Sequence, residues 1–172
     1  IYHACGLAID GTVDCWGFNG YGQLGIGTTE NKLLPVKVQG LSGVTSIAAG
    51  SYHTCAIVSG GAKCWGYNGN GQLGDGSTTN RTSPVQVSGL TSGVTKIATG
   101  DSHTCAIVSG GAVKCWGSNS GGQLGDGSTT NRTALVQVSG LTSGVTSITA
   151  GTYHTCAIVS GGAKCWGSNN SG

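Results

Sequence analysis

The chain of 172 residues contains no methionine, one phenylalanine, two prolines and few charged residues. Only 8% of its residues are charged, the net charge is +2, and the lysines and arginines occur singly, which argues against a nucleic-acid-binding surface. No apolar run approaches the roughly 20 residues of a membrane-spanning helix, so no membrane span is predicted. Because the chain lacks an initiating methionine and stops inside a repeat, we expect it to be a fragment of a longer protein.

Against these absences stand 34 glycines and a block that returns about every fifty residues. The block from His53 to Gly66 recurs with small changes, and the tryptophan near its end recurs with it; these are Trp16, Trp65, Trp116 and Trp166. A fixed period of this size is typical of a propeller or a solenoid. The repeat units are 3–52, 53–102, 103–153 and a partial unit 154–172.

Each unit contains signals for four short strands and none for a helix. In the second unit, residues 54–58 and 62–65 are β-rich segments that flank a Ser-Gly turn, as in a β-hairpin. Two further short strands are predicted at 85–87 and 94–98. Four strands in about fifty residues make one propeller blade. The predicted fold is therefore all-β: about three and a half four-stranded β-propeller blades, in an incomplete ring or part of a longer array.

Eight cysteines form four regular pairs: Cys5/Cys15, Cys55/Cys64, Cys105/Cys115 and Cys156/Cys165. If the two cysteines of a hairpin lie opposite each other, their Cα atoms are about 4.5–5.5 Å apart, which is close enough for a disulfide. Free thiols and metal ligation are the alternatives, although a zinc site needs four ligands and each unit offers one His and two Cys. Disulfides imply an oxidising compartment, so a secreted or surface protein is expected.

The repeated order His-Thr-Cys-Ala-Ile, Cys-Trp-Gly-x-Asn, Gly-Gln-Leu-Gly, Pro-Val-x-Val and Val-Thr-x-Ile-Ala-x-Gly resembles the regulator of chromosome condensation family over essentially the whole chain. The resemblance implies propeller blades, usually seven in a closed ring. The family's founder is an exchange factor for a small GTPase at chromatin. The cysteine pairs, however, make this chain more similar to secreted or surface relatives from bacteria and environmental microbes, among which the fold serves protein binding.

Three other motifs have structural readings that we prefer. Gly20 to Gly25 matches the dinucleotide fingerprint but no helix follows, so a turn is predicted. The oxygen-rich loops that begin at Asp75 and Asp126 each offer one carboxylate, which favours Asx turns over calcium binding.

Each repeated histidine is expected to make a structural hydrogen bond to a loop of its own blade or of the next. Glycosylation acceptor patterns occur at Asn80, Asn131 and Asn169.

No set of residues converges on a catalytic pattern, so we expect a non-enzymatic protein without cofactor or bound metal. The leading hypothesis is a binding or assembly scaffold whose partner is another protein or further copies of itself, joined into a ring or a fibre. The alternative is a specific binder of a protein or a glycan, similar to an inhibitor or a lectin. A GTPase exchange factor is the third hypothesis. A dedicated protein binder should vary its loops between blades, whereas one long loop is identical in two blades.

Overall fold

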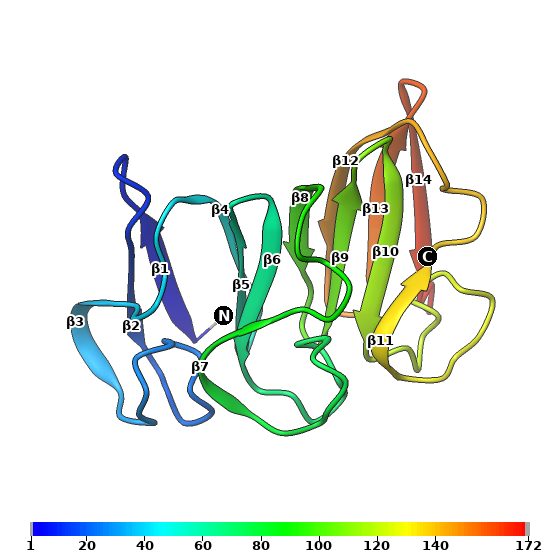
Figure 1. The fold of residues 1–172 in the computed structure, drawn as a ribbon. Coiled ribbons are helices and arrows are strands. Elements are labelled where there is room, and N and C mark those ends of the chain that lie inside the picture. Colours follow the sequence, from blue (N-terminus) through cyan, green and yellow to red (C-terminus); the bar gives the residue numbers. More distant parts are fainter. Residues whose placement is uncertain (1, 171–172) are drawn as a thin grey trace.

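A computed structural model describes residues 2–170 of the chain, and in this part it contains strands and turns but no helix. No helix there could cross a membrane. The sheets stand side by side as a curved row (Figure 1). The fourteen strands are β1 His3–Leu7, β2 Val13–Gly17, β3 Lys32–Lys37, β4 Val44–Ala49, β5 His53–Val58, β6 Gly61–Gly66, β7 Arg81–Gln86, β8 Val94–Thr99, β9 His103–Val108, β10 Ala112–Gly117, β11 Arg132–Gln137, β12 Val145–Ala150, β13 His154–Val159 and β14 Gly162–Gly167.

The strands form four antiparallel sheets, which confirms the all-β blade prediction. Two sheets are complete, with the orders β4-β5-β6-β7 and β11-β10-β9-β8, and the outer two have three strands each, β1-β2-β3 and β12-β13-β14. The first strand of each four-stranded sheet comes from the end of the preceding sequence period, since β4 pairs with β5 and β8 with β9. Consecutive units are therefore joined within a sheet as well as between sheets. The described sheets do not close into a ring (Figure 1).

The repeated hairpin has the register that the cysteine spacing predicts. Cys55 lies opposite Cys64 and Ile57 opposite Ala62, so the turn consists of Ser59 and Gly60. Both turn residues have positive φ, 50° and 77°, as a two-residue hairpin turn requires. In the third unit the hairpin cysteines are ten residues apart instead of nine, and the additional residue is taken up in a three-residue turn between Val108 and Ala112.

All four cysteine pairs lie at disulfide distance, with Cα atoms 4.1 Å apart in each pair. The distance is shorter than the 4.5–5.5 Å expected for directly opposite residues, but the pairs are those that the sequence indicated: Cys5–Cys15, Cys55–Cys64, Cys105–Cys115 and Cys156–Cys165. A bridge across each hairpin fixes the register of its two strands, because a one-residue slip would separate the sulfur atoms.

The cysteines differ in exposure, which their regular spacing did not indicate. In the first hairpin Cys15 is fully buried, because it packs in the cluster that contains Trp65 of the next sheet, whereas its partner Cys5 is only partly buried. In the last hairpin Cys165 is exposed. The cysteines of the two inner hairpins are all fully buried; these are Cys55, Cys64, Cys105 and Cys115. Burial thus follows the presence of a neighbouring sheet and not the repeat itself.

The hydrophobic core lies between the sheets. Cys55, Ile57 and Leu73 of the second sheet pack with Ala106 and Trp116 of the third in one buried cluster, and equivalent clusters fill the other two interfaces. Residues of β5 alternate between the two neighbours, so the strand is buried on both faces, as its apolar run predicts. A sheet without a neighbour would leave one apolar face exposed. The free energy of unfolding is therefore expected to increase with each interface that a further sheet adds.

The glycine that ends Gly-Gln-Leu-Gly is required by the next sheet's tryptophan. Gly74 has φ +65°, and a Cβ there would lie 2.7 Å from Nε1 of Trp116. The same relation holds between Gly25 and Trp65 and between Gly125 and Trp166, again at 2.7 Å. The repeated Gly-Gln-Leu-Gly is thus a turn, as predicted. The indole of the next sheet lies over this turn, which the sequence did not indicate.

Gly74→Ala should therefore destabilise the protein much more than Gly76→Ala. Gly76 also has positive φ, +82°, but a Cβ there meets nothing within 4 Å, so its substitution costs only the left-handed conformation, about 1 kcal/mol. Gly74→Ala adds a clash with the buried indole, about 2 kcal/mol more. Urea unfolding of both variants measures the difference. Equal losses would show that the indole contact does not constrain this position.

Candidate functional site

The sheets are joined by a repeated set of hydrogen bonds at one backbone carbonyl. The carbonyl of Gln23 accepts bonds from Thr54 Oγ1 at 2.8 Å and from Trp65 Nε1 at 2.9 Å, both from the next sheet. His3 Nε2 then lies 2.7 Å from Thr54 Oγ1. Because the threonine gives its hydrogen to the carbonyl, the imidazole must be the donor. The pattern recurs at the two following interfaces.

Three of the four repeated histidines, His3, His53 and His103, are therefore structural, as predicted, and they reach the next blade, whereas His154 is exposed. The prediction placed their partner in a loop, whereas the structure places it within a strand, at the threonine of His-Thr-Cys. Burial lowers the pKa of His3 and His103 to about 4 and that of His53 to about 3. These imidazoles are neutral in the folded protein at neutral pH.

The buried histidines should make the protein sensitive to mild acid. Their pKa values in the folded state, about 3 to 4, lie below the ordinary 6.5, so the unfolded state binds more protons between these values. The free energy of unfolding should fall as pH drops below 6.5, on the order of 2 kcal/mol per histidine by pH 5. Urea unfolding at pH 7 and pH 5 measures this loss. His53→Gln should reduce the pH dependence, and His154→Gln, at an exposed position, serves as the control. A free energy that does not change with pH would contradict the assignment.

The asparagine of Trp-Gly-x-Asn organises each long loop, a role that the sequence did not reveal. Asn68 is fully buried; its amide nitrogen donates to the carbonyls of Ser77 and Thr79, and its oxygen accepts from the nitrogen of Leu73. Asn19 and Asn119 make the same kind of bonds. These loops form the lower end of the row, opposite the hairpin turns (Figure 1).

The oxygen-rich loops have the Asx-turn geometry that was predicted. Asp75 Oδ1 accepts from the backbone nitrogen of Ser77 at 3.0 Å, and its other oxygen pairs with Arg81 at 2.8 Å. The hydrogen bond with Ser77, followed by Arg81 and Asn68, lowers the pKa of Asp75 despite its partial burial. Its carboxylate is already satisfied by protein donors. Within residues 2–170, no group of three or more His, Cys, Asp or Glu side chains is arranged to hold a metal.

The three glycosylation patterns differ in their surroundings. Asn80 and Asn131 are exposed, and their oxygens accept from the backbone nitrogens of Asn68 and Asn119. Asn169 is exposed as well, but it occupies the register of the buried Asn119, and the serine of its pattern, Ser171, lies outside the described residues. Glycosylation at these positions stays a prediction.

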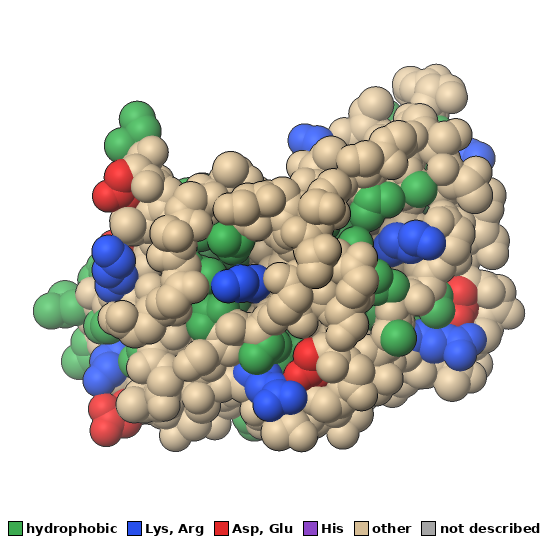
Figure 2. Space-filling model, in the orientation of Figure 1, with side chains coloured by type: hydrophobic (Ala, Val, Ile, Leu, Met, Phe, Trp, Pro, Cys, Tyr) green, Lys and Arg blue, Asp and Glu red, His purple; other side chains and the backbone are tan. Residues whose placement is uncertain are grey.

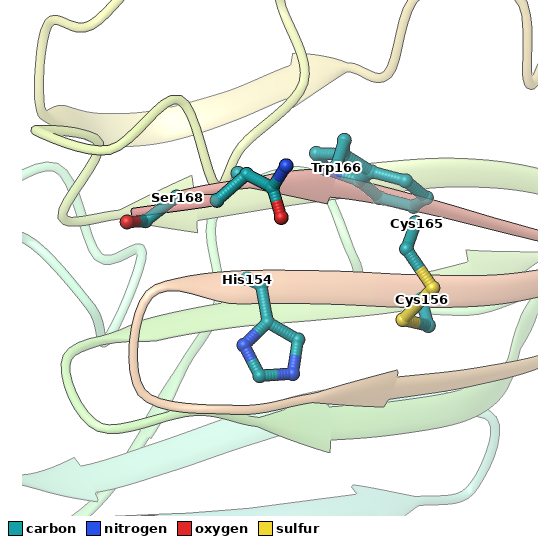
Figure 3. Close-up of a pocket in the computed structure, with 7 residues that line it drawn as sticks. His154, Cys156, Cys165, Trp166 and Ser168 are labelled. Carbon is teal, nitrogen blue, oxygen red and sulfur yellow. A yellow bond between two sulfur atoms is a disulfide. The ribbon is translucent and has the colours of Figure 1, made fainter. Parts of the chain in front are cut away.

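One hollow lies on the outer face of the last sheet. It has a volume of about 530 Å³ and is lined by His154, the Cys156–Cys165 bridge, Trp166 and the segment 167–169. Figure 3 shows His154 on β13 and the bridge between β13 and β14. On the preceding sheets the same positions are covered by a neighbour: His103 contacts Thr155 and the Cys105–Cys115 bridge packs against Ala157. The hollow is thus an inter-sheet face without a following sheet among the described residues.

A second candidate surface is an aromatic cluster at the loop end of the first two blades. The members are Tyr2, Phe18, Tyr21, Tyr52 and Tyr67. Tyr2 and Tyr52 stack with centroids 5.0 Å apart and planes 11° apart. Tyr21 contacts Tyr52 edge-on at 5.3 Å and Tyr67 at 5.0 Å. Tyr2 is 60% exposed and Tyr21 37% exposed, so the cluster is open to solvent.

The cluster is confined to the first half of the chain although the repeats otherwise match closely. Where Tyr52 and Tyr67 stand in the second unit, the third has Ser102 and Ser118. The residue two positions after Tyr67 changes with it. Gly69 lies under the ring, where a Cβ would be 2.2 Å from the tyrosine hydroxyl, and the third unit, with its serine, has Ser120 there instead. The aromatic side chains are therefore accommodated by paired changes within the repeat.

Sequence reasoning missed this cluster because its members lie up to 65 residues apart, from Tyr2 to Tyr67, and belong to three different positions of the repeat. The signal was present, since these positions differ between the second and third units while the Asp-Gly-Ser-Thr-Thr-Asn-Arg-Thr loop is identical in both. Only the meeting of two neighbouring blades shows that the variable residues adjoin.

The sheets, their shared inter-sheet contacts and their curved arrangement define an open row of β-propeller blades. Comparison with known proteins identifies the repeat family to which these blades belong. The family model "Regulator of chromosome condensation (RCC1) repeat" matches residues 10–57, 60–107 and 110–158, and a second model of this repeat matches 44–72, 94–123 and 145–172. The chain belongs to the regulator of chromosome condensation repeat family.

Individual proteins are similar to this chain in sequence or in fold. The Ultraviolet-B receptor UVR8 of Arabidopsis thaliana is 41% identical over 61 residues, which are 34% of this chain and 14% of the receptor. Human WBSCR16 matches in structure with a TM-score of 0.86 at 24% identity, over 96% of this chain and 45% of that one. Yeast RCC1 (Prp20), in a structure with Kap60, matches with a TM-score of 0.83 at 25% identity, over 96% and 41%. This chain spans less than half of each of these proteins.

Proposed function

We propose that this chain is a non-catalytic binding scaffold that recognises a partner protein at the loop end of its first two blades. The observation that carries the proposal is the aromatic cluster of Tyr2, Phe18, Tyr21, Tyr52 and Tyr67, which is solvent-open and restricted to one region of a repetitive molecule. Tyrosine is enriched among the residues that dominate protein interfaces, because it combines a large apolar ring with a polar tip.

The surroundings of the cluster have the composition of adaptable binding surfaces. Asn70 and Ser102 adjoin Tyr21, Tyr52 and Tyr67, and the intervening loops are rich in glycine. Antibody loops use this same set of tyrosine, serine, glycine and asparagine, in which rigid rings provide contact area and small polar groups provide hydrogen bonds. Charged side chains, by contrast, are scattered over the surface that Figure 2 shows, so an electrostatic footprint for nucleic acid is not formed there.

Protein binding by relatives of this fold agrees with the proposal. Yeast RCC1 (Prp20) is seen bound to Kap60, and Prp20p has been studied for its binding to Gsp1p and histones. We assign none of these partners to this chain. The sequence analysis ranked an assembly scaffold ahead of a specific binder. The variation at the aromatic positions favours the specific binder, because such a protein is expected to differ from blade to blade at its binding surface.

An extracellular setting is part of the proposal. The four cysteine pairs lie at disulfide distance, and no free cysteine remains among the described residues. Structural disulfides persist in oxidising compartments. A secreted or cell-surface scaffold would meet its partner there, without catalysis and without a cofactor.

The double variant Tyr52→Ser, Tyr67→Ser should lose partner binding. These substitutions install the residues that the third unit carries, so the fold should be retained, while loss of two interface aromatics weakens binding at least about tenfold. A displayed library of extracellular proteins would be selected on the unchanged chain, and the affinities of the selected proteins measured on both forms. Tyr153→Ser, at the position of Tyr52 in the fourth unit and 52% exposed, is the control. Selected proteins that bind the double variant equally well would overturn the proposal.

Self-association through the open sheet faces is a second proposal, and the hollow of about 530 Å³ on the last sheet favours it. The first sheet of another copy would bring Trp16 to the position that Trp166 takes in the preceding interface. The match is incomplete, because Ala4 stands where the inner sheets have the threonine that receives the histidine. We therefore place specific binding ahead of ring or fibre formation.

Sedimentation velocity over a concentration series tests the second proposal. Ala4→Thr supplies the missing partner for His154 of another copy and should tighten association, whereas Trp16→Ala removes the largest contact and should weaken it. A sedimentation coefficient that stays that of the monomer at every concentration, in all three forms, would exclude assembly through these faces.

A further inference from the structure

We propose that the aromatic cluster contains a binding site for one neutral pyranose ring of a glycan. The inference rests on the proposed binding role of the loop end and specifies the chemistry of what is bound there. A pocket of about 230 Å³ opens among Tyr21, Tyr52, Tyr67, Asn70 and Ser102, at the junction of three blades. This volume is below the roughly 300–1,000 Å³ of pockets for drug-sized ligands and suits a single ring.

The lining of the pocket selects a ligand without charge. The lining contains no aspartate, glutamate, histidine, lysine or arginine. Hydrogen bonding to Tyr2 and burial raise the pKa of Tyr52 above its ordinary value, so this phenol keeps its proton at neutral pH. The carboxylate of Asp101, whose charge acts on Tyr52, accepts a hydrogen bond from Ser51 and lines another cavity, not this one. A cation held against the rings would lack a carboxylate in the pocket, and an anion would lack any basic partner.

The lining also selects a ligand that is polar around its rim and apolar on its faces. Three phenol hydroxyls, one carboxamide and one hydroxyl surround the pocket. Asn70 Oδ1 already accepts from Asn131 Nδ2 at 3.1 Å, and Tyr52 is hydrogen-bonded to Tyr2. A buried apolar side chain of a peptide would still take the hydroxyls of Tyr21, Tyr67 and Ser102 out of water without replacing their hydrogen bonds, at a cost for each group. A pyranose offers hydroxyls around its edge and C–H bonds on its faces, and the electron-rich face of a tyrosine ring attracts such C–H groups.

Within the proposed binding surface, the pocket itself suits a sugar ring, and a protein partner would also have to contact residues around the cluster. A stable protein interface involves about 20–30 residues on each side. The side chains that distinguish the first two blades at this end number far fewer, whereas one sugar ring needs only a few stacking and hydrogen-bonding groups. The stacked pair of Tyr2 and Tyr52 extends the aromatic surface beyond the pocket, so that the next ring of a chain has a place to lie.

Saturation-transfer NMR with neutral methyl hexopyranosides of glucose, mannose, galactose and N-acetylglucosamine tests the site. At least one should receive saturation at its ring protons from the unchanged chain and from Tyr153→Ser. Transfer should drop at least about fivefold in Tyr52→Ser and in Tyr67→Ser, each checked for an unchanged thermal midpoint. If one variant unfolds, Tyr21→Asn, which installs the second unit's Asn70, replaces it. Acetylcholine, as a cationic probe, should receive none.

Absence of transfer to all four sugars, equal transfer in the tyrosine variants, or transfer to acetylcholine alone would overturn the inference. Selected protein partners that still require Tyr52 and Tyr67 would leave the proposed scaffold role in place, so the two failures can be told apart.

The source of the sugar follows from a second pair of measurements. Binding to a glycoprotein that is lost on enzymatic deglycosylation assigns a protein-linked glycan, and binding to a soluble neutral polysaccharide assigns a free one.

Discussion

The contact on which this molecule depends is made at the backbone carbonyl of the glutamine in Gly-Gln-Leu-Gly. At each interface that carbonyl accepts bonds from the threonine and the tryptophan of the following sheet, and the preceding histidine donates to the same threonine. At the first two interfaces all these groups are buried, so losing one partner would leave the others unsatisfied. The turn glycine beneath the indole, the alternation of apolar residues and the spacing of the sheets are all consistent with this one geometry. A β-rich sequence with low charge is thereby held in a defined order instead of pairing at random edges.

The disulfides have a separate and more local role. Each bridge closes a single hairpin and fixes its register, but it does not connect one sheet to another. Cohesion between blades comes from the buried clusters that combine the cysteines of one sheet with the alanine and tryptophan of the next, as Cys15 does with Ala56 and Trp65. The outer face of the last sheet has no such neighbour among the described residues. It forms a polar and aromatic hollow in which Cys165 of the cysteine bridge is exposed.

Against this repeated framework, the departures from repetition mark the surface that we propose as the binding site. The loop asparagines recur in three blades and the aspartate–arginine pairs in the second and third, and both serve the loops themselves. The aromatic residues and the glycines beneath them change from blade to blade without changing the framework. A scaffold of copies can thus hold one distinct surface, because the buried hydrogen bonds at the glutamine carbonyl, which join successive blades, do not involve the aromatic positions that vary.

The sequence by itself determined the period, the hairpins and the pairing of the cysteines, because these depend on residues close together in the chain and on a turn with few alternatives. Cys55 facing Cys64 across Ser59-Gly60 is such a case. It also indicated that the histidines are structural and allowed a partner in the next blade, but it expected a loop, whereas the partner of His53, Thr104, lies within strand β9. Only the tertiary structure decided which faces are covered, so that Cys15 is buried and Cys165 is not, and that the tyrosines of two blades meet. The reason is physical: the repeat specifies a blade, but a surface built by two blades exists only after their packing sets the angle and distance between them.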